Sequence, residues 1–214
     1  MIRNIIFDIG NVLVLFDETN HATKLFGHEK ASYILDCLWE KGIGDDFDRG
    51  VIPESQVIEK YIDHLPDLKE EILMYIETLG DCMRKFPYTN NWIHELKELG
   101  YNIYFLSNYS KWFMRANPSV LDFIKYTDGG VFSCDCHLLK PEKEIFHYIC
   151  DKYNLKKEEC FFIDDLKRNV KGANDFGIRS YHFEDYESSY EKIMNILKED
   201  RNDNWDRRDS FKTS

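Results

Sequence analysis

The sequence predicts an α/β fold, a doubly wound parallel sheet with a small helical domain inserted after its first strand. Short apolar runs that end in polar residues alternate with stripes of apolar residues at helical spacing. A long stretch between the first two runs shows helical stripes only. Apolar runs without polar alternation are typical of strands buried on both faces of a parallel sheet. Strands that alternate with helices indicate right-handed βαβ units.

Three strands are predicted, and each is followed by polar side chains. The strands and the residues that follow them are 4–7 with Asp8, 103–106 with Ser107 and Asn108, and 160–163 with Asp164 and Asp165. In parallel sheets ligands bind beyond the carboxyl ends of the strands. We therefore expect these polar side chains to lie together at one edge of the sheet and to form the functional site.

Helices are predicted where apolar residues recur every three or four positions. Trp92, Ile93, Leu96 and Leu99 form one such stripe, and Gly100 supplies a stop signal. Further stripes run through residues 145–153 and 193–197. These helices would cover the two faces of the sheet.

The stretch between the first two strands is too long for one crossover helix. Three helical stripes occupy residues 34–39, 57–62 and 68–83. We therefore predict a helical cap at residues 17–87, inserted into a core formed by residues 1–16 and 88–200. Residues 201–214 are charged, and the sequence from Glu199 onward lacks an apolar stripe, so an extended or frayed tail is expected there.

The charge balance excludes some classes of partner. The chain has 28 Lys and Arg residues against 39 Asp and Glu residues, a net charge of −11 with His neutral. An acidic surface repels phosphate backbones, so we expect no nucleic-acid partner. A small anionic substrate stays possible, because a local site can oppose the global charge.

The apolar runs and the cysteines indicate a cytoplasmic protein with no membrane partner. No run approaches the roughly 20 residues that span a bilayer, and the first residues do not form a signal peptide. Six cysteines without a secretory signal are typical of reduced thiols in a cytosol. Cys134, Cys136 and His137 lie close in sequence, but no second Cys/His pair completes a zinc site, so we interpret them as loop or strand-end residues.

Asp8, Ser107, Lys140, Asp164 and Asp165 have the chemistry of phosphoryl transfer. Carboxylate oxygens suit Mg²⁺, and a carboxylate can attack phosphorus to form an aspartyl-phosphate. A lysine and a metal ion would neutralise the phosphate oxygens. Taken singly, these residues have simpler interpretations, such as a turn cap for an aspartate or a surface position for the lysine. Their order and combination favour the catalytic hypothesis.

Four segments in order resemble the haloacid dehalogenase superfamily of Asp-nucleophile phosphohydrolases, whose core is Rossmann-like. They are Phe7-Asp8-Ile9-Gly10-Asn11-Val12-Leu13, Leu106-Ser107-Asn108, Lys140-Pro141-Glu142, and Phe162-Ile163-Asp164-Asp165 with Gly172-Ala173-Asn174 beyond it. The resemblance covers roughly residues 1–183. It implies that the helical insert is a small cap of the kind found in that family.

The resemblance also implies roles for individual residues. Asp8 is expected to be the nucleophile, and Ser107, Asn108 and Lys140 are expected to bind phosphate. By the same resemblance, Mg²⁺ would be held by Asp8, the backbone carbonyl of Gly10 and Asp164, with Asp165 in support. The substrate would be a small phosphorylated metabolite.

Gly10 departs from the family pattern, in which the first motif usually reads Asp-x-Asp and the second Asp exchanges protons. Asp-x-Gly-Asn-Val is similar to a bacterial branch of sugar-phosphate phosphatases that includes α-glucose-1-phosphate phosphatase. Sugar 1-phosphates have good leaving groups, which depend little on a proton donor. Asp17 is a candidate donor, although a turn cap is the simpler interpretation of this residue.

Substrate selection is expected to come from the cap. The candidate contacts there are Asp45, Asp46, Phe47, Asp48 and Arg49, and a solvated acidic loop is the alternative interpretation.

Two other functions remain open at this point. A haloacid dehalogenase uses the same Asp to attack carbon, but that chemistry has no need of a metal or of the pair Asp164 and Asp165. A degenerate member of the family would bind a metabolite or a partner without catalysis, because Gly10 has no acid group. A phosphorylation-dependent receiver module is disfavoured, since such modules are shorter and lack a cap.

Overall fold

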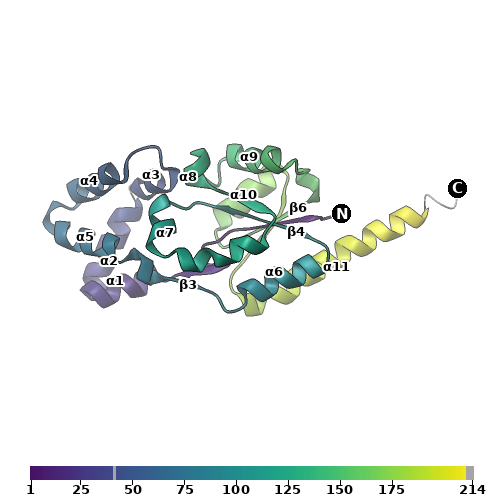
Figure 1. Cartoon of the computed structure of the whole chain (residues 1–214), viewed down its shortest axis with the longest axis horizontal. Coiled ribbons are helices and arrows are strands. Elements are labelled where there is room, and N and C mark those ends of the chain that lie inside the picture. The colour runs from purple at the N-terminus through teal and green to yellow at the C-terminus, as the bar shows by residue number, and fades with distance from the viewer. Residues whose placement is uncertain (41, 211–214) are drawn as a thin grey trace.

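A five-stranded parallel sheet forms the centre of the molecule, in a computed structural model that describes residues 1–40 and 42–210 (Figure 1). The strand order is β5-β4-β1-β6-β7. The strands are β1 (Asn4–Phe7), β4 (Asn102–Ser107), β5 (Gly129–Phe132), β6 (Cys160–Asp164) and β7 (Arg179–His182). This arrangement confirms the predicted doubly wound α/β fold.

The register of the sheet explains how distant polar residues meet. Phe7, the last residue of β1, lies between Phe105 of β4 and Ile163 of β6. All three strands run in the same direction, so their carboxyl ends share one edge. Asp8 and Asp164 therefore lie side by side at that edge.

Alternate residues of the strands bury against two different layers of helices. Ile5 and Phe7 belong to the cluster on the face covered by α6 (Thr89–Glu98) and α11 (Tyr186–Ser210). Ile6 belongs to the cluster under α9 (Lys143–Tyr153) and α10 (Lys167–Phe176) on the opposite face, as Figure 1 shows. Each fully buried side chain of this kind contributes roughly 1.5–3 kcal/mol of transfer free energy. The two-sided burial explains why the strands are apolar without alternation.

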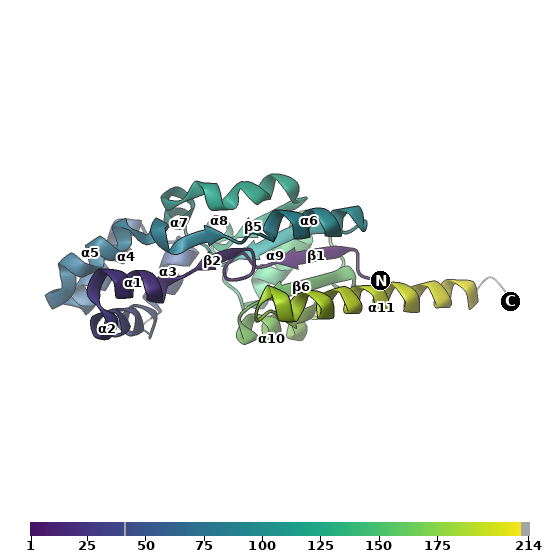
Figure 2. The same cartoon turned by 90° about the horizontal axis from the view of Figure 1, so that it is seen from below.

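Five helices form a cap beyond the carboxyl ends of the strands, at the end of the molecule opposite to α11 (Figures 1 and 2). They are α1 (Glu18–Phe26), α2 (His28–Glu40), α3 (Ile43–Arg49), α4 (Glu54–His64) and α5 (Lys69–Glu77), with short 3-10 turns η1 (Pro66–Leu68) and η2 (Leu79–Cys82). The chain enters and leaves the cap through a two-stranded antiparallel ribbon of β2 (Val14–Phe16) and β3 (Met83–Lys85). The cap helices thus fall within the insert predicted at residues 17–87.

The remaining elements connect the sheet to its helices. They are α7 (Lys111–Ala116), η3 (Pro118–Tyr126), α8 (Ser133–Cys136) and η4 (Lys157–Glu159). No helix in the described part of the chain is long and apolar enough to cross a membrane.

An extended or frayed tail was expected at residues 201–214. This expectation is wrong for residues 201–210, because α11 continues to Ser210. Ile193, Met194 and Leu197 bury against the core and anchor the helix. Once a helix is nucleated, each further residue adds a backbone hydrogen bond and costs little free energy, even without an apolar stripe. Residues 211–214 lie outside the described residues.

Candidate active site

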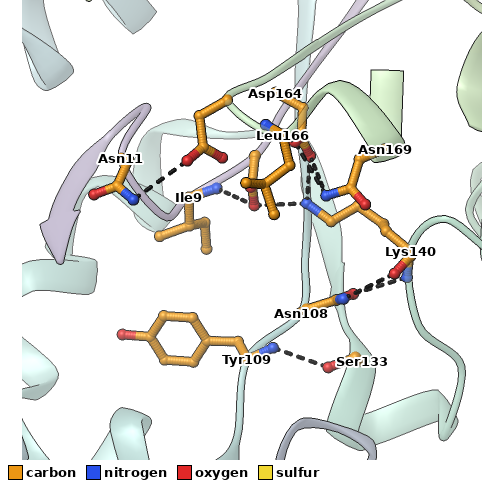
Figure 3. A network of polar contacts seen from close by, with 11 residues as sticks. Ile9, Asn11, Asn108, Tyr109, Ser133, Lys140, Asp164, Leu166 and Asn169 are labelled. Carbon is orange, nitrogen blue, oxygen red and sulfur yellow. Dashed lines mark hydrogen bonds and ion pairs between the residues drawn. The ribbon is translucent and has the colours of Figure 1, made fainter. Parts of the chain in front are cut away.

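The predicted polar residues meet at the carboxyl edge of the sheet (Figure 3). Asp8 follows β1, Ser107 ends β4, and Asp164 ends β6. Lys140 reaches the same place from the loop between α8 and α9. All four are buried, although each carries a polar or charged group. Buried charges are costly unless they are paired, so their pairing defines the site.

Lys140 lies between two aspartates. Its Nζ atom is 2.7 Å from Oδ1 of Asp8 and 2.7 Å from Oδ2 of Asp164. Burial alone lowers the pKa of the Lys140 amine, but the two carboxylates outweigh that effect and the pKa is raised. Lys140 therefore carries a fixed positive charge at the base of the site.

Asn108 holds the backbone of Lys140. The Asn108 side-chain amide donates to the Lys140 carbonyl at 3.0 Å, and its Oδ1 accepts from the Lys140 N–H at 2.8 Å. Asn108 was expected to bind phosphate, and the structure shows that its amide group positions Lys140. Ser107, the other expected phosphate ligand, lines the cavity beside it.

Three carboxylates form a group that fits a metal ion. Ligand atoms of Asp8, Asp164 and Asp165 all lie within 4.8 Å of one another. Burial, followed by the charges of Asp164 and Asp165, raises the pKa of Asp8 to about 8, although Lys140 acts in the opposite direction. Burial and Asp164 also raise the pKa of Asp165. Three acids beside one lysine leave negative charge to be balanced, and an all-oxygen donor set suits a hard cation such as Mg²⁺.

Neighbouring groups orient each of these carboxylates. The Leu166 N–H donates to Asp164 Oδ1 at 2.8 Å, and the Asn169 amide donates to the same carboxylate at 3.0 and 3.1 Å. The Asn11 amide donates to Asp165 at 3.2 Å. Sequence reasoning singled out neither Asn11 nor Asn169 for these contacts, although Asn11 belongs to the first of the recognised segments.

A cavity of about 460 Å³ opens above these residues, between the core and the cap. The core wall includes Asp8, Gly10, Ser107, Lys140 and Asp165. Elsewhere the lining includes the acids Glu18, Asp45 and Asp48 of the cap and the aromatic residues Phe16, Tyr109 and Phe113. Of this second set the sequence analysis singled out only Asp45 and Asp48, because the packing of the cap on the core determines which side chains face the cavity.

The structure does not bring Asp17, Asp46 or Arg49 to the wall of this cavity. Asp17 accepts a hydrogen bond from Asn20 at 2.9 Å. Asp46 forms an ion pair with Lys60 at 2.5 Å, and Arg49 pairs with Glu142, also at 2.5 Å. The expected contacts of these three side chains with a substrate therefore stay predictions that the geometry does not favour.

Cys136 and His137 of the local Cys/His cluster both contact backbone carbonyl groups. Cys136 Sγ lies 3.6 Å from the Ser133 carbonyl, and His137 Nδ1 lies 2.9 Å from the Arg49 carbonyl. Within the described residues, the three aspartates form the one group of His, Cys, Asp and Glu side chains with the spacing of a metal site.

Comparison with known proteins identifies the family. The model of the haloacid dehalogenase-like hydrolases matches residues 2–177, which include four of the five strands of the sheet, the cap, and Asp8, Lys140, Asp164 and Asp165. The chain belongs to this family of hydrolases.

Two curated relatives and one solved structure match most of the chain at low identity. Flavin mononucleotide hydrolase 1 of Arabidopsis thaliana is 23% identical over 90% of this chain and 76% of its own length. D-ribitol-5-phosphate phosphatase of Bacteroides thetaiotaomicron is 25% identical over 92% of this chain and 99% of its own. A family enzyme of the same bacterium, crystallised with magnesium and inorganic phosphate, has a TM-score of 0.66 at 21% identity and covers 86% of this chain and 95% of its own.

Proposed function

We propose that this hydrolase is a Mg²⁺-dependent phosphatase that acts on a small phosphorylated metabolite. The observation that carries the proposal is the pairing of Lys140 with Asp8 and Asp164 beneath the cavity, with Asp165 beside them. This arrangement combines a nucleophile, a fixed positive charge and a set of metal ligands at one place.

Asp8 is the proposed nucleophile. Its Oδ1 accepts hydrogen bonds from the Ile9 N–H at 2.7 Å and from Lys140 at 2.7 Å, so the rotation of the carboxyl group is fixed before substrate arrives. The carboxylate attacks phosphorus, the ester oxygen leaves, and water later hydrolyses the aspartyl-phosphate. Lys140 would offset charge on the phosphate oxygens, and Ser107 with Asn108 would line their site.

Mg²⁺ would be held by Asp8, the Gly10 carbonyl, Asp164 and Asp165. When bound, it would neutralise the phosphate and the surrounding carboxylates. Relatives support this cofactor, because a structural neighbour was crystallised with magnesium and phosphate.

The proposed substrate is a sugar phosphate or a related polyol phosphate, such as glucose 1-phosphate. Carboxylates on the cap side of the cavity accept hydrogen bonds, and hydroxyl groups supply them. The name of the Bacteroides relative, a ribitol-phosphate phosphatase, points to the same chemical class. We keep the division into a core at residues 1–16 and 88–200 and a selecting cap at 17–87, together with a cytoplasmic location, as part of this proposal.

Two alternatives are less well supported by the geometry. A haloacid dehalogenase would use Asp8 as its nucleophile, but it would have no need of the further pair Asp164 and Asp165 clustered beside it. A degenerate binding member would not need a nucleophile held by both a backbone N–H and a buried lysine.

The test is a screen of phosphorylated metabolites with the pure protein, with Mg²⁺ and with a chelator. We expect phosphate release that requires Mg²⁺. Asp8→Asn should lower kcat by at least about 1,000-fold while circular dichroism stays unchanged, since an amide keeps the shape but cannot attack phosphorus. Rates in Asp8→Asn near those of the wild type would show that Asp8 is not the nucleophile. Halide release from 2-haloacids without phosphate release would favour the dehalogenase instead.

A further inference from the structure

The site has a nucleophile, but every carboxyl group on the core side of the cavity belongs to the proposed metal cluster. An alkyl ester oxygen leaves slowly as an alkoxide, so it needs an acid within hydrogen-bond reach. Asp8, Asp164 and Asp165 form the proposed metal cluster. Gly10, which faces the same cavity, has no side chain.

Asp48 lines this cavity from the cap. It is the sixth residue of the cap helix α3, and it lines the cavity together with Asp8 and Lys140. Its charge interacts with that of Lys140, which itself contacts Asp8. A phosphate bound against Asp8 and Lys140 would direct its ester oxygen away from Asp8, toward the cap.

Three contacts hold α3 against the core and so determine the position of Asp48. The Ser133 hydroxyl donates to the Asp48 carbonyl at 2.6 Å. The Arg49 guanidinium forms two hydrogen bonds with Glu142, at 2.5 and 3.2 Å. His137 Nδ1 lies 2.9 Å from the Arg49 carbonyl. A side chain on a helix fixed in this way can approach a substrate without a cap movement.

We propose that Asp48 is the general acid and base of the reaction, a role that rests on the proposed phosphatase function. In the first step Asp8 forms a bond to phosphorus, the P–O ester bond breaks, and the Asp48 carboxyl group gives its proton to the leaving oxygen, so that an alcohol departs. In the second step the Asp48 carboxylate takes a proton from the attacking water. The Asp8–phosphorus bond then breaks, inorganic phosphate forms, and Asp48 is protonated again.

The surroundings of Asp48 suit both protonation states near neutral pH. Removal from water, and then the negative charges of Glu18 and Asp45, raise the pKa of Asp48 to about 7, while Lys140 and Arg168 act in the opposite direction. Three further titratable groups interact electrostatically with Asp48, namely Tyr61, Tyr109 and Cys134. All three are neutral at that pH, because burial raises their pKa values.

The first experiment compares leaving groups at saturating Mg²⁺. In Asp48→Asn we expect kcat for alkyl phosphates to fall at least about 100-fold, and kcat for 4-nitrophenyl phosphate to fall less than about 10-fold, because nitrophenolate leaves without a proton. Asp63→Asn, an exposed acid of the cap on α4, is the matched control and should match the wild type on both substrates. An equal loss on both substrates, or a rise in KM alone, would overturn the proposal.

The second experiment needs no variant of Asp48. For an alkyl phosphate, the wild-type kcat should fall as the pH rises through about 7, because the acid form disappears. A flat profile up to pH 9 would overturn the proposal. Wild-type protein that is inactive toward all phosphates would overturn the phosphatase function as well, whereas an active wild type with a flat profile would overturn only the role of Asp48.

The third experiment is a rescue. A Cβ atom built on Gly10 would have Phe16 at 3.8 Å as its near neighbour, so an aspartate has room there. Gly10→Asp in the Asp48→Asn background should restore alkyl-phosphate turnover by at least about 10-fold without changing KM in the same proportion. A double variant no faster than Asp48→Asn on the alkyl substrate would count against a missing proton donor.

Discussion

At the scale of single residues, the charge balance of the site depends on Lys140. The side chain is buried, and both of its close partners are buried aspartates. Removing one partner of a buried ion pair leaves an uncompensated charge, which costs more than the pair contributed. Lys140 therefore has a structural role as well as its proposed catalytic one.

Replacing Lys140 by methionine tests that structural role. In metal-free protein, Lys140→Met should lower the free energy of unfolding by about 3–5 kcal/mol at pH 8. The loss should be smaller at pH 5, because the orphaned carboxylates can then take up protons in the native state. Urea melts at the two pH values measure both quantities, and Lys171→Met, at an exposed position of α10, is the control. A loss independent of pH would mean that packing rather than charge explains the effect.

The sequence could predict some residues of the site but not others, and the difference lies in what positions each side chain. Asp8 and Asp164 were predictable, because strand ends of a parallel sheet share an edge whatever else the chain does. Lys140 lies in the loop between α8 and α9, and the resemblance of the segment Lys140-Pro141-Glu142 to a known motif predicted its place in the site. The role of Asn108 was not predictable, because its neighbour in space, the Lys140 backbone, lies 32 residues away in the chain. Asp48 was one of five candidates for substrate contact on the cap, and the sequence does not show that Asp48 lines the cavity whereas Asp46 pairs with Lys60.

At the scale of elements, helix α10 approaches the Lys140 loop unusually closely. A Cβ atom added to Gly172 would lie 2.7 Å from both Cβ and the carbonyl oxygen of Pro141. Pro141 is a rigid residue, so it cannot move aside as a flexible side chain would. The absence of a side chain at Gly172 thus lets α10 support the loop that carries Lys140.

We expect Gly172→Ala to push α10 and this loop apart. The free energy of unfolding should fall by about 1–3 kcal/mol, as overpacked cores usually show, even though alanine favours helices. Phosphatase kcat should fall as well, because Lys140 moves with the loop. Lys171→Ala, one position earlier on the same helix, is the control for both measurements. A Gly172→Ala protein as stable and active as the control would show that the loop adjusts freely.

The sequence did not predict two strands of the sheet, β5 and β7, and the physical reasons are similar for both. β5 contains Gly129 and Gly130, which lower strand propensity. The ring of Phe105 lies where a Gly130 side chain would be, and Tyr153 accepts a hydrogen bond from the Gly130 N–H at 2.8 Å. β7 (Arg179–His182) is short and polar, and it lies at the other edge of the sheet. Edge strands are held by tertiary contacts of this kind, which local patterns do not record.

At the scale of the whole molecule, an acidic protein concentrates further negative charge in one cavity. The net charge is −11, and the lining of the cavity has five acids against two basic residues, Lys140 and Arg168. The acids are Asp8, Glu18, Asp45, Asp48 and Asp165. Without a cation these groups repel one another, so proton binding and metal binding compete to relieve the same repulsion.

Mg²⁺ should therefore stabilise the protein more strongly at high pH. The raised pKa of Asp8, about 8, means that native metal-free protein holds a proton there at pH 6, which Mg²⁺ must displace. A Mg²⁺ concentration of 100 times Kd adds about 2.7 kcal/mol to the free energy of unfolding. For a chain of this size, that increase raises Tm by roughly 5–10 °C. We expect a shift near that value at pH 8.5 and a clearly smaller one at pH 6. Asp164→Asn should abolish the shift, and equal shifts at both pH values would contradict proton competition.

The central place of β1 in the sheet has a consequence for synthesis on the ribosome. Its neighbours in β4 and β6 are 98 and 156 residues further along the chain. At roughly 5–20 residues per second, the first strand waits about 8–30 s for its second neighbour to be made. The cap helices contact partners nearby in sequence and can form during that interval. A nascent chain that stalls before Cys160 would thus expose one edge of a buried strand, which makes it a natural client for a chaperone.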